Sequence, residues 1–110
     1  MFGFGSNPFS ITQEEFLERA RKGAHIIDVR SPQEFQEGHI KKAKNIPVNM
    51  LGAHLNELKK YADKKEDVLL YCLTGSRSAF AYKFLNKNGL AEQMYDLKGG
   101  IVRWNGPLGA

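Results

Sequence analysis

Short apolar runs alternate with amphipathic segments along the chain, and this alternation predicts its secondary structure. The apolar runs predict strands over residues 9–11, 25–29, 43–47, 68–71 and 93–97. The amphipathic segments predict helices over residues 13–22, 32–38, 51–61 and 78–88, with a final helical turn over residues 101–104. The run over residues 68–71 is apolar throughout, as expected of a strand that is buried on both faces.

Capping signals mark several of the predicted helix ends. Thr12 and Glu15 are spaced as a capping box, and so are Ser31 and Glu34, with a proline at the first helical position of the second helix. Gly89 follows the helix that is predicted to end near Asn88, as expected of a C-cap. These signals support the helix assignments independently of the periodicity.

Strands that alternate with helices predict an α/β fold, with about five short strands in a central parallel sheet and helices on both of its faces. Sheets of this kind bind ligands at the carboxyl ends of their strands. Asp28 and Arg30 lie at the end of one predicted strand, and Cys72 follows another. The three side chains are therefore candidates for one site at this edge of the sheet.

Chain length and the amino-terminal residues suggest the domain organisation. A chain of 110 residues is long enough for one domain with a modest core. We expect residues 1–8 to form an irregular arm and residues 9–110 to form that domain. No apolar stretch approaches a transmembrane span, and residues 1–8 lack the basic residues and apolar core of a secretory signal. The sequence therefore predicts a cytoplasmic protein without a membrane partner.

Composition and charge argue against several function classes. The net charge of +4 comes mostly from scattered lysines, and no aromatic residues interleave with the densest group, Lys41, Lys42 and Lys44. A solvated basic face is therefore a better interpretation than a nucleic-acid site. A single cysteine permits neither an internal disulfide nor a dithiol metal site, and His25 and His54 lack a ligand pattern. We expect no metal and no cofactor.

The single cysteine lies between a predicted strand end and a predicted helix start. Cys72 is followed by Gly75, which tolerates φ > 0, and by Arg77, which adds positive charge. The N–H groups of such a loop and the dipole of the following helix favour an anion. Cys72 is therefore predicted to be a thiolate and a nucleophile. The alternative is a small buried hydrophobic residue, which is the commoner role of a lone cysteine.

Three segments of the chain carry recognisable signatures. The first comprises Ile27-Asp28-Val29-Arg30, Glu34-Phe35, Gly38-His39-Ile40, Ala43 and Asn45-Ile46-Pro47. The second is Tyr71-Cys72-Leu73-Thr74-Gly75-Ser76-Arg77-Ser78, and the third is Gly99-Gly100 with Trp104. In this order they resemble the single-domain rhodaneses, which are sulfurtransferases. The resemblance spans nearly the whole domain and implies the rhodanese-like three-layer sandwich.

The resemblance implies a sulfur relay through Cys72. The thiolate would attack the sulfane sulfur of thiosulfate or a persulfide, and cyanide or a thiol would then remove that sulfur from the Cys72 persulfide. The implied partners are a small sulfur donor and a thiophilic acceptor, with a thiol-carrying protein as a further candidate, and the implied state is a monomer. The substrate-binding residues of the loop would be Leu73, Thr74, Gly75, Ser76, Arg77 and Ser78.

Two positions depart from the tandem-domain thiosulfate rhodaneses that the chain otherwise resembles. Those enzymes have an arginine where this chain has Glu34 and a basic residue where it has Thr74, so Arg77 is the only cation of this loop. Thiosulfate is therefore expected to be a poor or merely laboratory donor. A persulfide on a small thiol or on another protein is the alternative.

Loop length separates this loop from a related anion cradle. Cysteine-dependent phosphatases and arsenate reductases have five residues between their cysteine and arginine, whereas four lie between Cys72 and Arg77. The missing residue shortens the loop by up to roughly 3.5 Å, which suits one sulfur atom better than a tetrahedral oxyanion. The other alternative is a catalytically silent binding module, although such rhodanese-like modules usually lack the cysteine.

The remaining candidates have structural interpretations beside their chemical ones. Asp28 and Arg30 are expected to support the wall of the site as an ion-paired or hydrogen-bonded strand end, rather than to react. Ser76 and Ser78 would offer hydroxyl groups to a bound anion, or Ser78 would only cap the helix. His39 is expected to form a structural hydrogen bond.

Overall fold

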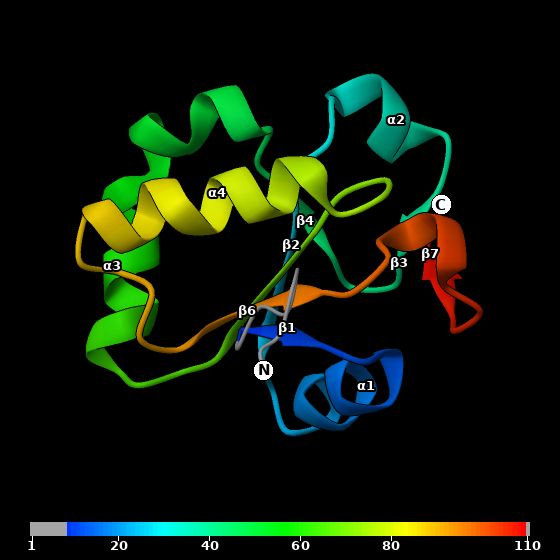
Figure 1. Ribbon diagram of the computed structural model, residues 1–110, viewed down its shortest axis with the longest axis horizontal. Coiled ribbons are helices and arrows are strands. Elements are labelled where there is room, and N and C mark those ends of the chain that lie inside the picture. The colour runs from blue at the N-terminus through cyan, green and yellow to red at the C-terminus, as the bar shows by residue number, and fades with distance from the viewer. Residues whose placement is uncertain (1–8, 110) are drawn as a thin grey trace, which may run out of the picture.

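Five parallel strands form the centre of the protein in the computed structural model, which describes residues 9–109 (Figure 1). They are β1 (Ser10–Ile11), β2 (His25–Asp28), β4 (Lys44–Asn45), β5 (Val68–Tyr71) and β6 (Met94–Leu97). Their order is β1-β6-β5-β2-β4, and every neighbouring pair is parallel. The predicted α/β fold with a five-stranded parallel sheet is confirmed. The arm predicted over residues 1–8 lies outside the described residues.

Helices cover both faces of the sheet, as predicted (Figure 1). They are α1 (Gln13–Arg21), α2 (Pro32–Gln36), η1 (Val48–His54), α3 (Leu55–Asp63), α4 (Ser76–Lys87) and η2 (Ile101–Arg103), where η denotes a 3-10 helix. Ser31 and Glu34 form the complete capping box, whereas at α1 only the bond from Glu15 N–H to Thr12 Oγ1 is present. Within residues 9–109, no helix has the length and apolar character needed to cross a membrane.

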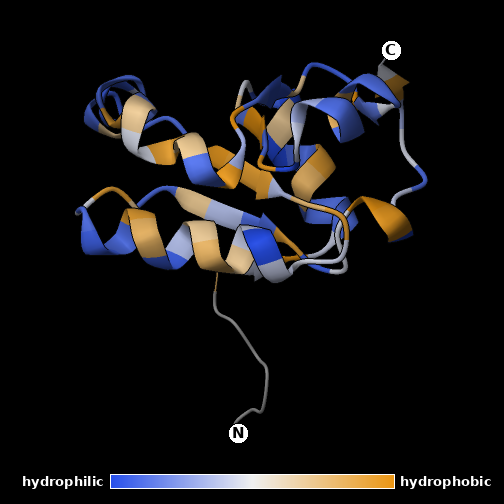
Figure 2. Cartoon of the chain, turned by 90° about the horizontal axis from the view of Figure 1, so that it is seen from above, coloured by the Kyte–Doolittle hydropathy of each residue, from blue (hydrophilic) through white to orange (hydrophobic). Residues whose placement is uncertain are grey.

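The sheet separates two apolar cores. Val68 and Leu70 on β5 face the core under η1, α3 and α4, while Leu69 and Tyr71 face the core under α1. All four side chains are buried, which confirms that this strand is covered on both faces. Hydrophobic and hydrophilic residues alternate along the helix ribbons, as expected of helices with one buried face (Figure 2). The loop that follows Tyr71 is therefore anchored to the most buried strand.

Two helix starts differ from the sequence prediction. The segment predicted as a helix over residues 51–61 begins inside η1, and Gly52 disfavours an α-helical start there. α4 begins at Ser76 rather than Ser78, because Gly75 adopts φ 118° and occupies the N-cap position. Ser78 therefore lies inside the first helical turn, and the alternative role of helix cap is wrong.

The sequence did not predict a second, two-stranded sheet. It pairs β3 (His39–Ile40) with β7 (Leu108–Gly109) in antiparallel orientation. Each strand is only two residues long, which is too short for an alternating pattern to be recognised. This pairing connects the chain after η2 to the segment that follows α2.

Candidate active site

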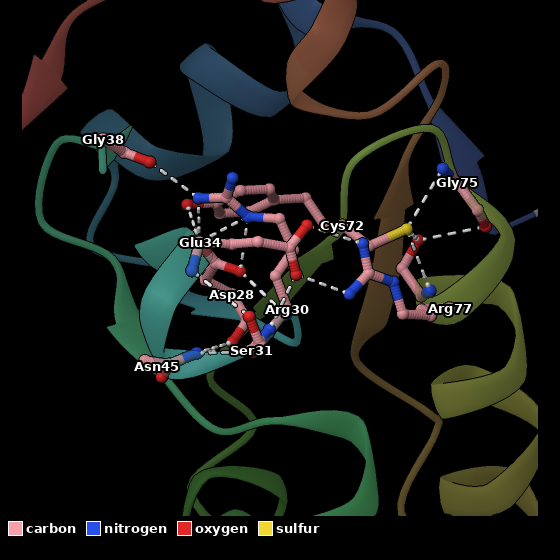
Figure 3. Close-up of polar contacts among 11 residues, drawn as sticks. Asp28, Arg30, Ser31, Glu34, Gly38, Asn45, Cys72, Gly75 and Arg77 are labelled. Atoms are coloured by element: carbon pink, nitrogen blue, oxygen red, sulfur yellow. Dashed lines mark hydrogen bonds and ion pairs between the residues drawn. The ribbon is translucent and has the colours of Figure 1, made fainter. Parts of the chain in front are cut away.

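The sulfur atom of Cys72 lies at the amino-terminal end of α4. Cys72 follows β5 directly and is fully buried. The backbone N–H groups of Gly75 and Ser78 donate hydrogen bonds to its Sγ atom at 3.1 and 3.3 Å (Figure 3). The dipole of α4, a helix of 12 residues, adds partial positive charge at the same end. The loop therefore directs two fixed donors and a helix terminus at one sulfur atom.

The turn at Gly100 supports the cysteine loop from outside. The N–H groups of Ile101 and Val102 donate to the carbonyl oxygens of Cys72 and Leu73 at 2.9 and 3.0 Å. Gly100 has φ 67°, and a Cβ atom at this position would lie 2.3 Å from the Leu73 carbonyl oxygen. Only glycine fits this close approach of two backbone segments.

Arg77 is bound by a carboxylate from α2. Its two terminal nitrogens donate to the two carboxylate oxygens of Glu34 at 2.7 and 3.0 Å (Figure 3). The Arg77 guanidinium lowers the pKa of Glu34 to about 2, and the bond from the Ser31 backbone adds to this effect. The positive charge that Arg77 brings to the loop is therefore largely compensated by Glu34.

Asp28 and Arg30 form a buried ion pair beside the loop, as predicted. The guanidinium of Arg30 donates to both carboxylate oxygens of Asp28, at best 2.7 Å, and to the carbonyl oxygen of Gly38 at 2.7 Å. The Tyr71 hydroxyl donates to Asp28 Oδ2 at 2.6 Å and accepts from Ile40 N–H at 3.0 Å. Burial raises the pKa of Tyr71, and its bond to Asp28 raises it further. The carboxylate is thus fully engaged in a rigid wall.

One member of this site was not among the sequence candidates. Asp96 on β6 is 4% exposed, and the Ser78 hydroxyl donates a hydrogen bond to its Oδ1 atom. Burial raises the pKa of Asp96 to about 6, although the bond from Ser78 opposes the shift. The available signal was a carboxylate between Tyr95 and Leu97 in a predicted strand.

Residues 12–107 match a family model described as the rhodanese-like domain. The chain belongs to this family. It is 46% identical to the uncharacterized protein YqhL of Bacillus subtilis over 92% of this chain and 75% of that protein. It is 31% identical to the thiosulfate sulfurtransferase GlpE of Vibrio cholerae, over 77% of this chain and 76% of that protein. A crystal structure of a rhodanese-like domain protein from Staphylococcus aureus matches with a TM-score of 0.73 at 31% identity, covering 87% of this chain and 90% of that one.

The rest of this rhodanese-like loop offers backbone groups to a ligand. The side chains of Leu73, Thr74 and Ser76 are exposed, so they lie on the rim and not beside the sulfur. The backbone N–H groups of Thr74, Ser76 and Arg77 form no hydrogen bond to residues 9–109. These N–H groups are therefore available to a bound anion.

The histidines of this rhodanese-like chain have structural surroundings. His39 Nδ1 lies 2.9 Å from the carbonyl oxygen of Phe35, and the two rings are stacked. This is the structural hydrogen bond expected of His39. His25 and His54 each pair with a glutamate. Over residues 9–109, no group of three histidine, cysteine, aspartate or glutamate side chains is arranged to hold a metal ion.

Proposed function

We propose that this protein is a sulfurtransferase that carries sulfane sulfur as a persulfide on Cys72. In the first half-reaction, the Cys72 thiolate attacks the sulfane sulfur of thiosulfate or a persulfide. The S–S bond of the donor breaks, and sulfite or a thiolate leaves with the bonding electron pair. In the second half-reaction, cyanide or a thiolate attacks the outer sulfur, and the Cys72 thiolate is regenerated. The cycle consumes no external oxidant or reductant.

The observation that carries this proposal is the pair of N–H donors on Cys72 Sγ at the start of α4. Fixed donors at a helix terminus stabilise a sulfur anion without reorganising during the reaction. In the persulfide the negative charge lies on the outer sulfur, and the free N–H groups of Thr74, Ser76 and Arg77 in the same loop are available to receive it. The similarity to a thiosulfate sulfurtransferase supports the same chemistry.

The arrangement around Arg77 supports sulfur over phosphate as the transferred group. A phosphate-binding loop needs its arginine to point toward the oxyanion, whereas the guanidinium group of Arg77 is bound to Glu34. The short loop from Cys72 to Arg77 also leaves its N–H donors directed at one atom. Hydrolysis of a phosphate ester by the protein would contradict this assignment.

The Glu34–Arg77 pair also bears on the choice of donor. Thiosulfate is a dianion, and the compensated Arg77 offers it little net positive charge. A persulfide on a small thiol or on a carrier protein carries less charge at the reacting end. We therefore propose a persulfide as the preferred donor and a thiol as the preferred acceptor, both acting on a monomer. A cytoplasmic location stays a prediction.

Intact mass measurement after incubation with sulfur donors tests the proposal. Reduced protein is incubated separately with thiosulfate and with glutathione persulfide. We expect a gain of one sulfur atom, its removal by cyanide as thiocyanate, and no gain in Cys72→Ser. Uptake from the persulfide alone would identify the donor class. No uptake from either donor would overturn the proposal and favour a binding module.

A further inference from the structure

Asp96 is a buried carboxyl group with a single hydrogen-bonding partner for its side chain. In the sheet it pairs with Ser10 on β1 and Leu70 on β5. Its side chain lies on the face that α4 covers, where the Ser78 hydroxyl donates to Oδ1. Within residues 9–109 no other group forms a hydrogen bond to this carboxylate. Neither the fold nor the sulfur transfer described above requires an acidic group at this place.

Ser78 connects this carboxyl group to the nucleophile. Its Oγ atom lies 3.5 Å from Cys72 Sγ and 3.2 Å from the Gly75 carbonyl oxygen, and it also contacts Asp96 Oδ1. A hydroxyl group has one hydrogen, so it donates to one acceptor at a time while it accepts from others. An ionised Asp96 takes the Ser78 hydrogen and leaves Oγ to accept from the Cys72 thiol. A protonated Asp96 donates to Oγ and frees the Ser78 hydrogen for the sulfur or for the Gly75 carbonyl oxygen.

We propose that Asp96 is a positioning residue that takes up the proton of Cys72 through Ser78 as the sulfur becomes a thiolate. The S–H bond of Cys72 breaks as its proton moves to Ser78 Oγ, and the original hydroxyl hydrogen of Ser78 moves to Asp96 Oδ1. The three side chains together keep one negative charge, and Ser78 finishes as a donor to the thiolate. This inference rests on the proposed function, because it concerns the same nucleophile.

The surroundings of Asp96 favour such a shared proton. β1 contains no charged residue, Cys72 follows β5, and the titratable residues of α4 are Arg77, Tyr82, Lys83 and Lys87. Arg77 is already bound by Glu34, and no cation forms an ion pair with Asp96 within residues 9–109. Two anions separated by one hydroxyl group in a buried site repel each other strongly. The inferred proton transfer through Ser78 therefore lets Asp96 and Cys72 share one proton.

The pH dependence of Cys72 alkylation by iodoacetamide tests this inference without any sulfur donor. In Asp96→Asn the amide carries no charge and can donate to Ser78 Oγ, which leaves the hydroxyl hydrogen for the sulfur. We expect the midpoint of the alkylation profile to fall by about one pH unit. Below the wild-type midpoint this corresponds to about tenfold faster alkylation. Asp63→Asn, at an exposed carboxylate of α3, is the matched control and keeps the wild-type profile. An unchanged midpoint in Asp96→Asn overturns the inference.

A second substitution tests the route through Ser78. The shift caused by Asp96→Asn is measured again in a Ser78→Ala background. If the proton passes through the hydroxyl group, most of the shift is lost in that background. A shift of equal size in both backgrounds would indicate a charge effect through space and would overturn the role given to Ser78.

Nuclear magnetic resonance of the unsubstituted protein keeps the inference testable if Asp96→Asn does not fold. The carboxyl carbon shift of Asp96 is followed against pH, first with free Cys72 and then with carbamidomethylated Cys72. A shared proton gives a second step in the Asp96 carboxyl shift at the alkylation midpoint, and this step disappears after Cys72 is modified. Identical curves for free and modified Cys72 overturn the inference.

Sulfur uptake is measured separately, so that the two proposals can fail independently. Its absence in the wild type overturns the proposed function. An unchanged alkylation profile in an Asp96→Asn protein that takes up sulfur overturns only this inference.

Discussion

Two buried carboxylates, Asp28 on β2 and Asp96 on β6, lie on the two strands that flank β5. Asp28 receives the guanidinium fork of Arg30 and the hydroxyl group of Tyr71. Among the described residues, Asp96 receives only the hydroxyl group of Ser78. The strand that precedes the cysteine thus has a compensated carboxylate on one side and an uncompensated one on the other.

The difference between Asp28 and Asp96 shows that a buried carboxylate can serve either structure or proton exchange. A carboxylate that is paired with a buried cation holds its neighbours in place, because the charge of either partner alone would be costly. A carboxylate that is buried without a cation has a raised pKa, so it exchanges its proton at a pH closer to neutral. The Asp28 side of the site therefore acts as a rigid wall, and the Asp96 side is available for proton transfer.

Removal of the charge at Asp28 should produce the largest effect. Asp28→Asn leaves Arg30 buried without a counter-ion, so we expect the free energy of unfolding to fall by about 3–5 kcal/mol. Asp96→Asn leaves no such cation behind and should cost less than about 1 kcal/mol at pH 7. Urea unfolding of both variants at pH 7 measures the contrast. Equal losses in the two variants would contradict the distinction between the carboxylates.

The backbone packing that holds the cysteine side should be the next most sensitive feature. Gly100→Ala places a methyl group against the Leu73 carbonyl oxygen at positive φ. We expect a loss of about 3 kcal/mol from strain and overpacking, together with altered alkylation of Cys72. Gly52→Ala is the matched control, because a Cβ atom there meets no other atom within 4 Å. Comparable losses in both variants would argue against a specific role of the Gly100 contact.

The stability contributed by Asp96 should depend on pH in a defined direction. Its folded pKa of about 6 lies above the ordinary value of 3.8, so the folded state binds the proton more tightly. This contribution is present below pH 3.8 and is lost as the pH rises through 6. From pH 4 to pH 7 the stability of the wild type relative to Asp96→Asn should fall by about 2 kcal/mol. Chemical unfolding at both pH values measures this difference, and a constant difference would contradict it.

The smallest effect concerns the cation beside the loop. Glu34→Gln frees Arg77, so kcat/KM for thiosulfate should rise by roughly tenfold relative to a glutathione persulfide donor. Glu57→Gln is the matched control, because Glu57 also has a pKa of about 2 but lies on α3 and pairs with Lys44. A similar rise in both variants, or none in Glu34→Gln, would contradict the assigned role of the Glu34–Arg77 pair.

The features that the sequence predicted correctly are those encoded locally. The apolar runs, the capping residues at Thr12 and Ser31, and the loop from Cys72 to Ser78 each occupy a few consecutive positions. Their physical meaning follows from periodicity and turn chemistry alone. The ion-paired strand end of Asp28 and Arg30 was predictable for the same reason, because its members lie two residues apart.

The features that escaped prediction join residues far apart in the chain. Glu34 and Arg77 are 43 positions apart, and Ser78 and Asp96 are 18 apart. Their contacts depend on the order of the strands and on the start of α4 at Ser76, which periodicity does not specify. A carboxylate within an apolar strand was a visible anomaly, but its partner could be identified only from the fold.

The strand order also has a consequence for how the protein forms during synthesis. β1 pairs only with β6 in the main sheet, so during synthesis this strand waits for residues 94–97. The cysteine loop likewise receives its outer backbone bonds from Ile101 and Val102. Cys72 therefore reaches its assembled surroundings only after residues 101 and 102 have been translated, and such non-local pairing slows folding.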